Sequence, residues 1–250
     1  MKRMLMIIAL IGAMPCFAAP EDSSGFSLNQ FRIVYPAAEK KGITWSMTNN
    51  TGRAYLMQSW IRPMDFTTGL PAAESESKGP GDAIPLMVTP PLKRLDHGEQ
   101  LTLRIRLTGM TLPEDRESVF YLSVKGIPAM PDKASQTGGQ LVLAVVNNMK
   151  LFYRPEGLPD AGVKGAAKQL RFSVHNDALV VDNPSPFYIN LSQVTVGGKP
   201  LEAEALRRLV PPKGQQRYPV SAGMRGEVTW QVVDEDSQLT PLMRQSENNS

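Results

Sequence analysis

The chain has 250 residues, of which 42% are hydrophobic, 20% charged and 7% aromatic. This is the composition of a globular protein, so it excludes a wholly disordered chain and a protein with many membrane spans. The formal net charge is +3, and two of the positive charges, Lys2 and Arg3, lie in the leader described next. A nucleic-acid-binding protein carries a far larger and patterned basic excess, so we expect no nucleic-acid partner.

Residues 1–18 have the three parts of a secretory signal peptide. Lys2 and Arg3 form the positive region, residues 4–14 the apolar run and residues 16–18 the small-residue cleavage site. The apolar run is shorter than the roughly 20 residues that a membrane-spanning helix needs. The only cysteine, Cys16, lies in this leader. We therefore expect an exported mature chain that has neither a disulfide nor a cysteine-bound metal.

Short β-rich runs recur along the rest of the chain, separated by turn residues such as Asn-Asn-Thr-Gly at 49–52. With few convincing helices, this spacing is typical of β-sandwiches and predicts an all-β fold. Two sets of runs predict two sandwiches, an N-terminal domain of residues 19–155 and a C-terminal domain of residues 156–250 with a frayed end. The expected strands are 26–34, 42–48, 55–61, 101–107, 119–124 and 141–153 in the first set, and 170–174, 178–181, 187–196, 216–220 and 226–233 in the second.

One of these runs is apolar on both faces, since residues 141–146 read Leu-Val-Leu-Ala-Val-Val. In a strand, Leu141, Leu143 and Val145 point to one face and the residues between them to the other. A sandwich strand normally buries only one face in its own core, so the second face needs a partner. Two interpretations are open: a central strand covered on both sides by its own domain, or a strand that lends its outer row to another chain.

Four further segments stand in a fixed order along the chain. They are residues 89–95 (TPPLKRL), 112–128 (beginning LPEDRESVFY), 150–155 (KLFYRP) and 183–188 (NPSPFY). In this order and spacing, behind a signal peptide, they resemble the motifs of periplasmic pilus (fimbrial) chaperones of the chaperone–usher pathway, the PapD-like family. The resemblance covers nearly the whole mature chain and is strongest in its first half.

The resemblance implies two immunoglobulin-like sandwiches set at an angle, with a cleft between them. It also implies a periplasmic, ATP-independent chaperone that binds, folds and caps pilus subunits by donor-strand complementation and delivers them to an outer-membrane usher. A pilus subunit of this pathway lacks its last strand, so it exposes a hydrophobic groove and unpaired edge amides that would otherwise template aggregation. No cofactor, metal or catalytic residue is implied.

Carried over residue by residue, the family places Arg32 and Lys150 in the cleft, where they grip the C-terminal carboxylate of the subunit. Arginine suits this task because its planar fork can hold a carboxylate through two hydrogen bonds. Without the resemblance, both would be interpreted as strand cations that face water or pair internally. The donor row implied for the subunit groove is Leu141, Leu143 and Val145, and we expect the opposite row to fill the chaperone's own core.

The family also implies a salt-bridge cluster that joins the two domains and fixes their angle. Glu117 and Arg154 match two of its members. The third member departs from the family pattern, because residues 230–237 here read WQVVDEDS. Our alignment places Glu235 at the acidic position, with Asp234 as a one-residue alternative, and a solvated acidic run is the competing interpretation.

Other functions fit the sequence less well. The two histidines, His97 and His175, lie in turn-like contexts without a nucleophile or metal-binding motif nearby, so we expect no enzyme. A secreted Ig-like structural component of a surface fibre would have an incomplete strand set, whereas both halves here are complete. A general periplasmic holdase is the third reading. Self-association of the free protein, to cover the donor row, is also left open.

Overall fold

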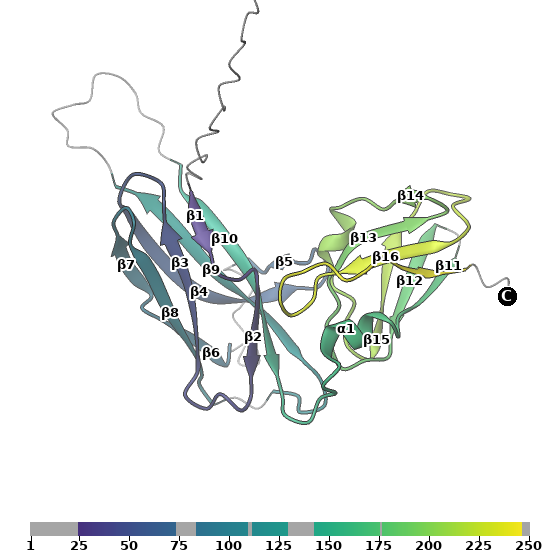
Figure 1. Ribbon diagram of the computed structural model, residues 1–250, viewed down its shortest axis with the longest axis horizontal. Coiled ribbons are helices and arrows are strands. Elements are labelled where there is room, and N and C mark those ends of the chain that lie inside the picture. Colours follow the sequence, from purple (N-terminus) through teal and green to yellow (C-terminus); the bar gives the residue numbers. More distant parts are fainter. Residues whose placement is uncertain (1–24, 74–83, 110–111, 130–142, 176, 247–250) are drawn as a thin grey trace, which may run out of the picture.

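The computed structural model describes residues 25–73, 84–109, 112–129, 143–175 and 177–246. It consists of two β-sandwiches side by side along the long axis, the N-terminal one coloured purple to teal and the C-terminal one green to yellow (Figure 1). The prediction of an all-β, two-domain immunoglobulin-like fold is confirmed. The predicted leader and Leu141 lie outside the described residues. Within the described ranges, no helix is long and apolar enough to cross a membrane.

The N-terminal sandwich packs two sheets face to face. The first sheet has the order β1 (Phe26–Leu28), β3 (Ile43–Asn49), β8 (Gln100–Leu107) and β6 (Leu86–Thr89). The second has the order β2 (Arg32–Pro36), β10 (Val145–Arg154), β9 (Ser118–Pro128), β4 (Tyr55–Asp65) and β5 (Leu70–Pro71), with β7 (Leu92–Leu95) also paired to β4. Strand β8 shows the period of two that sequence alternation predicts, because Leu101, Leu103 and Ile105 are fully buried between exposed neighbours.

The C-terminal sandwich is smaller. A three-stranded sheet, β11 (Arg171–His175), β12 (Ala178–Asn183) and β15 (Gly214–Pro219), faces a four-stranded one, β14 (Lys199–Pro200), β13 (Leu191–Val196), β16 (Val228–Val232) and β17 (Met243–Gln245). A short helix, α1 (Gly162–Ala167), and a single 3₁₀ turn, η2 (Ala205–Arg207), complete it. The core holds α1 in place, because the indole Nε1 of Trp230 donates a hydrogen bond of 3.1 Å to the carbonyl of Ala167.

Two of the expected strands are interrupted in the structure. The run predicted as one strand over residues 26–34 is two strands, β1 and β2, in opposite sheets of the N-terminal sandwich. The chain crosses between the sheets at residues 29–31, where the carbonyl of Gln30 accepts a hydrogen bond of 3.0 Å from the indole of Trp45. The run predicted over 187–196 forms a regular strand only from Leu191, preceded by an isolated bridge between Ile189 and Val210.

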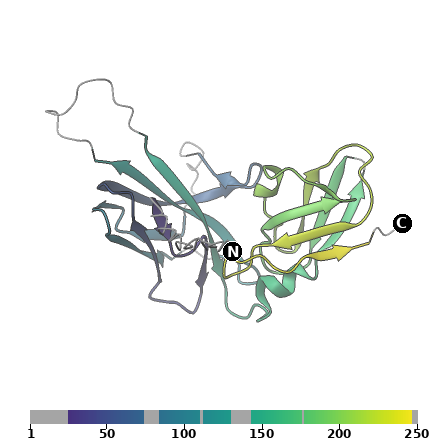
Figure 2. The same cartoon turned by 45° about the horizontal axis from the view of Figure 1, so that its top comes forward.

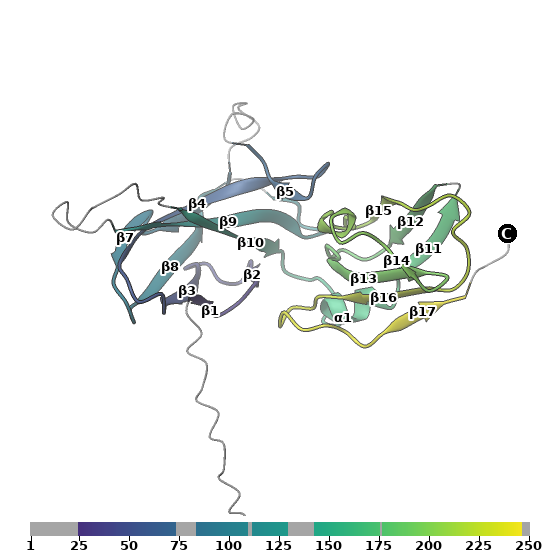
Figure 3. The ribbon, with the colours of Figure 1, turned by 90° about the horizontal axis from the view of Figure 1, so that it is seen from above.

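The two sandwiches meet where β9 begins and β10 ends, as the views in Figures 2 and 3 show. A small cluster of buried side chains joins them at this junction. It contains residues of both sandwiches, namely Met64, Val119, Tyr121, Phe152, Tyr188 and Leu209. The junction therefore has an apolar core of its own, and the site described below is built around it.

Each sandwich contains a fully buried asparagine that organises a turn. In the C-terminal one, the side-chain amide of Asn183 donates to the carbonyls of Phe187 (2.8 Å) and Pro211 (2.9 Å). Its carbonyl oxygen accepts from the backbone N–H and the hydroxyl of Ser185 (3.1 and 2.6 Å). Asn49 plays the same part in the N-terminal sandwich. Buried backbone groups need such partners, since leaving them unpaired is costly.

We expect Asn183→Ala to lower the free energy of unfolding by about 3 kcal/mol, because it leaves buried carbonyl groups without a donor. Urea unfolding followed by circular dichroism measures this. The exposed amide of Gln215 offers a control in the same sheet, and Gln215→Ala should change the value by less than about 0.5 kcal/mol. Equal effects of the two substitutions would contradict the role assigned to Asn183.

Candidate anion-binding cleft between the two sandwiches

Arg32 and Lys150 are brought together on neighbouring strands. Arg32 begins β2, Lys150 lies within β10, and the two residues are directly paired in the parallel register of these strands. Both line a cavity of about 270 Å³ that opens between the sandwiches. Its other walls are aromatic, aliphatic and polar side chains from both domains, namely Phe31, Phe152, Asn190, Val233 and Ser237.

The Arg32 side chain is only 4% exposed. Its guanidinium lies 3.7 Å from the centre of the Phe152 ring and 3.7 Å from the carboxylate of Glu117, and its Nη2 donates a long hydrogen bond (3.4 Å) to the carbonyl of Tyr188. Burial lowers the pKa of Arg32 to about 10, although Glu117 opposes this shift. Among the described residues, its Nε and Nη1 have no hydrogen-bond partner. Buried N–H groups of a cation without a partner favour binding of an anion.

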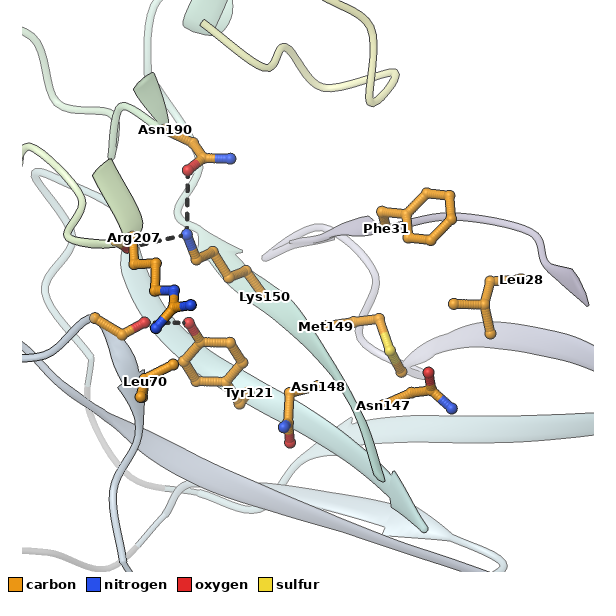
Figure 4. A pocket seen from close by; sticks show the side chains of 11 residues that line it. Leu28, Phe31, Leu70, Tyr121, Asn147, Asn148, Met149, Lys150, Asn190 and Arg207 are labelled. Carbon is orange, nitrogen blue, oxygen red and sulfur yellow. Dashed lines mark hydrogen bonds between the residues drawn. The ribbon is translucent and has the colours of Figure 1, made fainter. Parts of the chain in front are cut away.

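The Lys150 amine is held from the C-terminal sandwich. Its Nζ donates to Oδ1 of Asn190 (3.1 Å) and to the carbonyl of Arg207 (3.3 Å), as Figure 4 shows. Burial, and after it the positive charge of Arg32, lowers the pKa of Lys150 to about 8. Its two partners are neutral, so the ammonium charge is balanced by no carboxylate within hydrogen-bonding distance in the described structure. A carboxylate in the cavity would supply that charge.

A second hollow of about 370 Å³ adjoins the first and shares Phe31, Lys150 and Asn190 with it. It runs beside β10 toward Leu28 and Met149, on the side where Figure 4 shows Phe31 and Leu28 opposite the strand. The cleft therefore continues from the two cations along β10, between the open edge of this strand on the side of Leu28 and the side chains of Tyr121 and Leu70. An extended chain could lie in it with one end at Arg32 and Lys150.

That edge of β10 is open over half its length. Strand β2 covers only Lys150 to Arg154, whereas β9 pairs with β10 from Val145 onward on the other side. Residues 145–149 thus present unpaired backbone groups among the described residues. Leu143 and Val145 are 68% and 49% exposed beside them. Such an edge is a template for a further strand.

The expectation that the opposite row fills the chaperone's own core is wrong for the described residues. Ala144 is exposed and Val146 is 42% exposed. The row that enters the core of the N-terminal sandwich is instead the one that contains Leu143 and Val145, because it continues in Met149 and Leu151, which are buried there. The alternate row continues in Asn148 and Lys150 and faces outward, toward the cleft.

Glu117, Arg154 and Glu235 form one cluster across the junction. Nε and Nη2 of Arg154 donate to Oε1 of Glu117 (2.9 and 2.8 Å), and Nη2 also lies 3.1 Å from Oε1 of Glu235. Glu235 accepts in addition from the backbone N–H of Val163 (2.7 Å) in α1. Asp234, the alternative, points elsewhere: it accepts from backbone N–H groups of its own turn and pairs with Lys164 (3.1 Å).

Sequence reasoning missed the residues of the C-terminal sandwich that complete the cleft. Asn190 and the carbonyl of Arg207 hold Lys150, and the carbonyl of Tyr188 holds Arg32. Tyr188 ends the NPSPFY segment, so that motif marked the right place. A main-chain carbonyl, however, leaves no signal in the residue types.

A basic cleft between two immunoglobulin-like sandwiches, beside an open strand edge, defines a class of protein that can bind an extended chain end. Residues 25–159 match the family described as pili and flagellar-assembly chaperone, PapD N-terminal domain. Residues 165–237 match the pili assembly chaperone PapD, C-terminal domain. The chain belongs to this family of pilus assembly chaperones, and it is a chaperone of fimbrial assembly.

Individual relatives are also chaperones. The chain is 34% identical to the chaperone protein FocC of Escherichia coli over 231 residues, which cover 91% of this chain and 92% of FocC. It is similar to a chain in the structure of the Salmonella enterica SafA pilin in complex with the SafB chaperone (TM-score 0.73, 29% identity, 89% and 96% of the two chains). It is also similar to the periplasmic chaperone SfaE (TM-score 0.66, 32% identity, 88% and 98%). The family is one of non-enzymatic chaperones.

The cleft predicts an unusual titration of Lys150. We expect its amine to titrate near pH 8, and Arg32→Gln to raise this pKa because the substitution removes a neighbouring positive charge. Lysine side-chain NMR over pH 6 to 11 measures both values. Because the pKa is lower in the folded state, the unfolded chain binds more protons above pH 8, so the free energy of unfolding should rise with pH from 8 to about 10.5.

The control for this titration is Arg94→Gln, which removes an exposed arginine from β7. It should leave the pKa of Lys150 unchanged. A value close to 10.5 in the wild-type protein would show that the amine is solvated and would contradict the enclosed cleft.

Proposed function

We propose that this protein is a periplasmic chaperone that binds, folds and caps pilus subunits by donor-strand complementation. It delivers them to an outer-membrane usher and uses neither ATP nor a cofactor. One observation carries the proposal: Arg32 has two unpaired N–H groups and Lys150 has only neutral partners among the described residues, and both lie beside the open edge and exposed apolar row of β10. The leader of residues 1–18 is the export signal, and residues 19–155 and 156–250 are the two domains.

The cations anchor the client by its C-terminal carboxylate. The unpaired Nε and Nη1 of Arg32 offer two donors, and Lys150 adds an ammonium group from the adjacent strand. Charge-assisted hydrogen bonds of this kind are roughly twice as strong as neutral ones. A carboxylate fixed at Lys150 also fixes the register of the strand that leads away from it, and register decides which side chains enter a groove.

The donor row is Leu141, Leu143 and Val145, and two observations support this choice. Leu143 and Val145 are exposed, and their row continues as buried core in Met149 and Leu151. A client sandwich that lacks a strand would pair with β10 and pack its hydrophobic groove on Leu143 and Val145. The core of the client would then continue into the core of the N-terminal sandwich along the same row of β10. Burying each of these side chains contributes roughly 1.5–3 kcal/mol.

The cluster of Glu117, Arg154 and Glu235 holds the angle between the domains. It joins β10 and the start of β9 to the loop after β16 and to α1 through charge-assisted hydrogen bonds. The relatives support the proposed client and compartment, since one solved structure is a complex of a chaperone with a pilin and another is described as a periplasmic chaperone.

The carboxylate anchor is tested by co-purification from periplasm of cells that express the neighbouring fibre genes. We expect wild-type protein to recover a pilus subunit, identified by mass spectrometry. The double variant Arg32→Ala, Lys150→Ala should recover at least about tenfold less of this subunit, because it removes two charge-assisted contacts. The matched control is Lys93→Ala, Arg94→Ala, which removes one lysine and one arginine from the exposed strand β7.

Two other outcomes would point to other functions. Equal recovery by wild type and the double variant would retire the anchor and favour a general holdase. Absence of any subunit from the wild-type sample would instead favour a structural component of the fibre.

The donor row is tested by placing the same charge on either face of β10. Val145→Asp should abolish recovery of the subunit, because it puts a carboxylate into the apolar groove of the client. Val146→Asp changes a neighbouring residue of similar exposure that faces the other way, so it should retain most of the recovery. Equal loss in both variants, each with wild-type circular dichroism, would show that the two rows are not distinguished.

A further inference from the structure

The turn between β4 and β5 contacts the C-terminal sandwich closely at Gly69. Gly69, in this turn, has φ +72°, and a Cβ atom built on it would lie 2.5 Å from the backbone C and O of Arg207 and 2.7 Å from the backbone N of Arg208. Real Cβ atoms do not approach other atoms this closely. The contact therefore requires glycine, both for the left-handed conformation and for the space.

The backbone of Arg207, which Gly69 contacts, also holds Lys150. The carbonyl of Arg207 accepts the hydrogen bond from Lys150 Nζ at 3.3 Å. On the other side of the turn, the hydroxyl of Tyr121 donates to the carbonyl of Gly69 at 2.5 Å, and Tyr121 is the register partner of Lys150 on β9. Gly69 thus lies between the strand that carries Lys150 and the carbonyl that receives its amine.

The same turn also reaches the partner of Arg32. The ring of Phe66 stacks on that of Tyr188, with centroids 6.2 Å apart and an interplanar angle of 20°. The carbonyl of Tyr188 accepts from Arg32 Nη2. One turn of the N-terminal sandwich therefore supports both backbone carbonyls by which the C-terminal sandwich holds the two cations.

The turn is held by hydrogen bonds among its own residues. Asp65 accepts hydrogen bonds from the backbone N–H of Thr67 (2.8 Å) and the hydroxyl of Thr68 (2.6 Å), and its carbonyl accepts from the N–H of Gly69 (2.8 Å). These bonds lie within a few residues of each other. Because these hydrogen bonds fix the conformation of the turn, the turn can set the position of the backbone that packs against it.

We infer that Gly69 is a positioning residue for the anion-binding cleft, and that the β4–β5 turn sets how closely the C-terminal sandwich approaches Lys150 and Arg32. It acts from the side opposite α1 and Glu235, so the spacing of the two domains is held at two places. The consequence for clients rests on the proposed carboxylate anchor, whereas the geometry of the cleft does not.

The test compares two glycines with similar positive φ angles. Gly69→Ala introduces a methyl group at φ +72° against Arg207, whereas Gly98→Ala introduces one at φ +77° with no atom within 4 Å. The two positions are thus matched in φ and differ in the contact that the methyl group makes. The readouts are the pKa of the Lys150 amine by NMR and the affinity of the full-length chain for acetate, which stands in for a terminal carboxylate.

We expect Gly69→Ala to raise the pKa of Lys150 from about 8 toward 10.5, because the displaced sandwich lets water reach the amine. Acetate binding should weaken on the order of tenfold, and Gly98→Ala should leave both quantities at wild-type values. An unchanged Lys150 pKa in Gly69→Ala, or the same shift in both variants, would overturn the inference.

Phe66→Ala keeps the test decisive if Gly69→Ala does not fold. This substitution removes an exposed ring and creates no clash. It should weaken acetate binding, because Phe66 packs on Tyr188 and the carbonyl of Tyr188 holds Arg32. If Gly69→Ala is unfolded, wild-type acetate affinity in Phe66→Ala would overturn the inference. The two proposals fail separately. Acetate bound by none of the proteins would contradict the carboxylate anchor, while the Lys150 pKa would still decide the role of Gly69.

Discussion

The carboxylate of Glu117 lies almost fully buried where the two sandwiches meet, and both of its oxygens are used. Oε1 holds Arg154, while Oε2 accepts from the backbone N–H of Tyr188 at 2.9 Å and lies 3.7 Å from Arg32. A buried carboxylate is stable only when paired and hydrogen-bonded, and breaking such a pair typically costs about 3–5 kcal/mol. This one group therefore ties the position of the C-terminal sandwich to the charge state of the cleft.

The surplus of positive charge in the cleft follows from this arrangement. Glu117 and Glu235 are engaged chiefly by Arg154, which leaves Arg32 with a distant carboxylate and Lys150 with neutral oxygens only. Burial is the main cause of both lowered pKa values; nearby carboxylates offset it in part for Arg32, and no carboxylate offsets it for Lys150. The protein keeps two cations partly desolvated in its resting form, so an incoming anion finds donors that need no rearrangement.

The sequence could predict the sandwiches because alternation in strands such as β8 and turn residues at 49–52 depend only on local chemistry. It could propose Lys150 because that residue begins the segment KLFYRP, and Arg32 because the family resemblance places a second cation at that position. It could not supply Asn190 or the carbonyl of Arg207, which are 40 and 57 residues from Lys150 and meet it only through the fold. Which row of residues 143–146 faces the core was predicted wrongly because both rows there are apolar. The buried Met149 and Leu151, which continue the row of Leu143 and Val145, mark that row as the one that leads into the core.

The half-covered edge of β10 has a consequence for the entropy of association. Residues 145–149 are already extended and hydrogen-bonded to β9 before any partner arrives. Fixing the backbone of one residue costs roughly 1–2 kcal/mol, and for these residues folding of the chaperone has met that cost in advance. An unfolded chain that pairs with this edge loses only its own freedom. For the proposed client, the sheet would thus be one preformed half of a folding nucleus, supplied from outside the chain that folds.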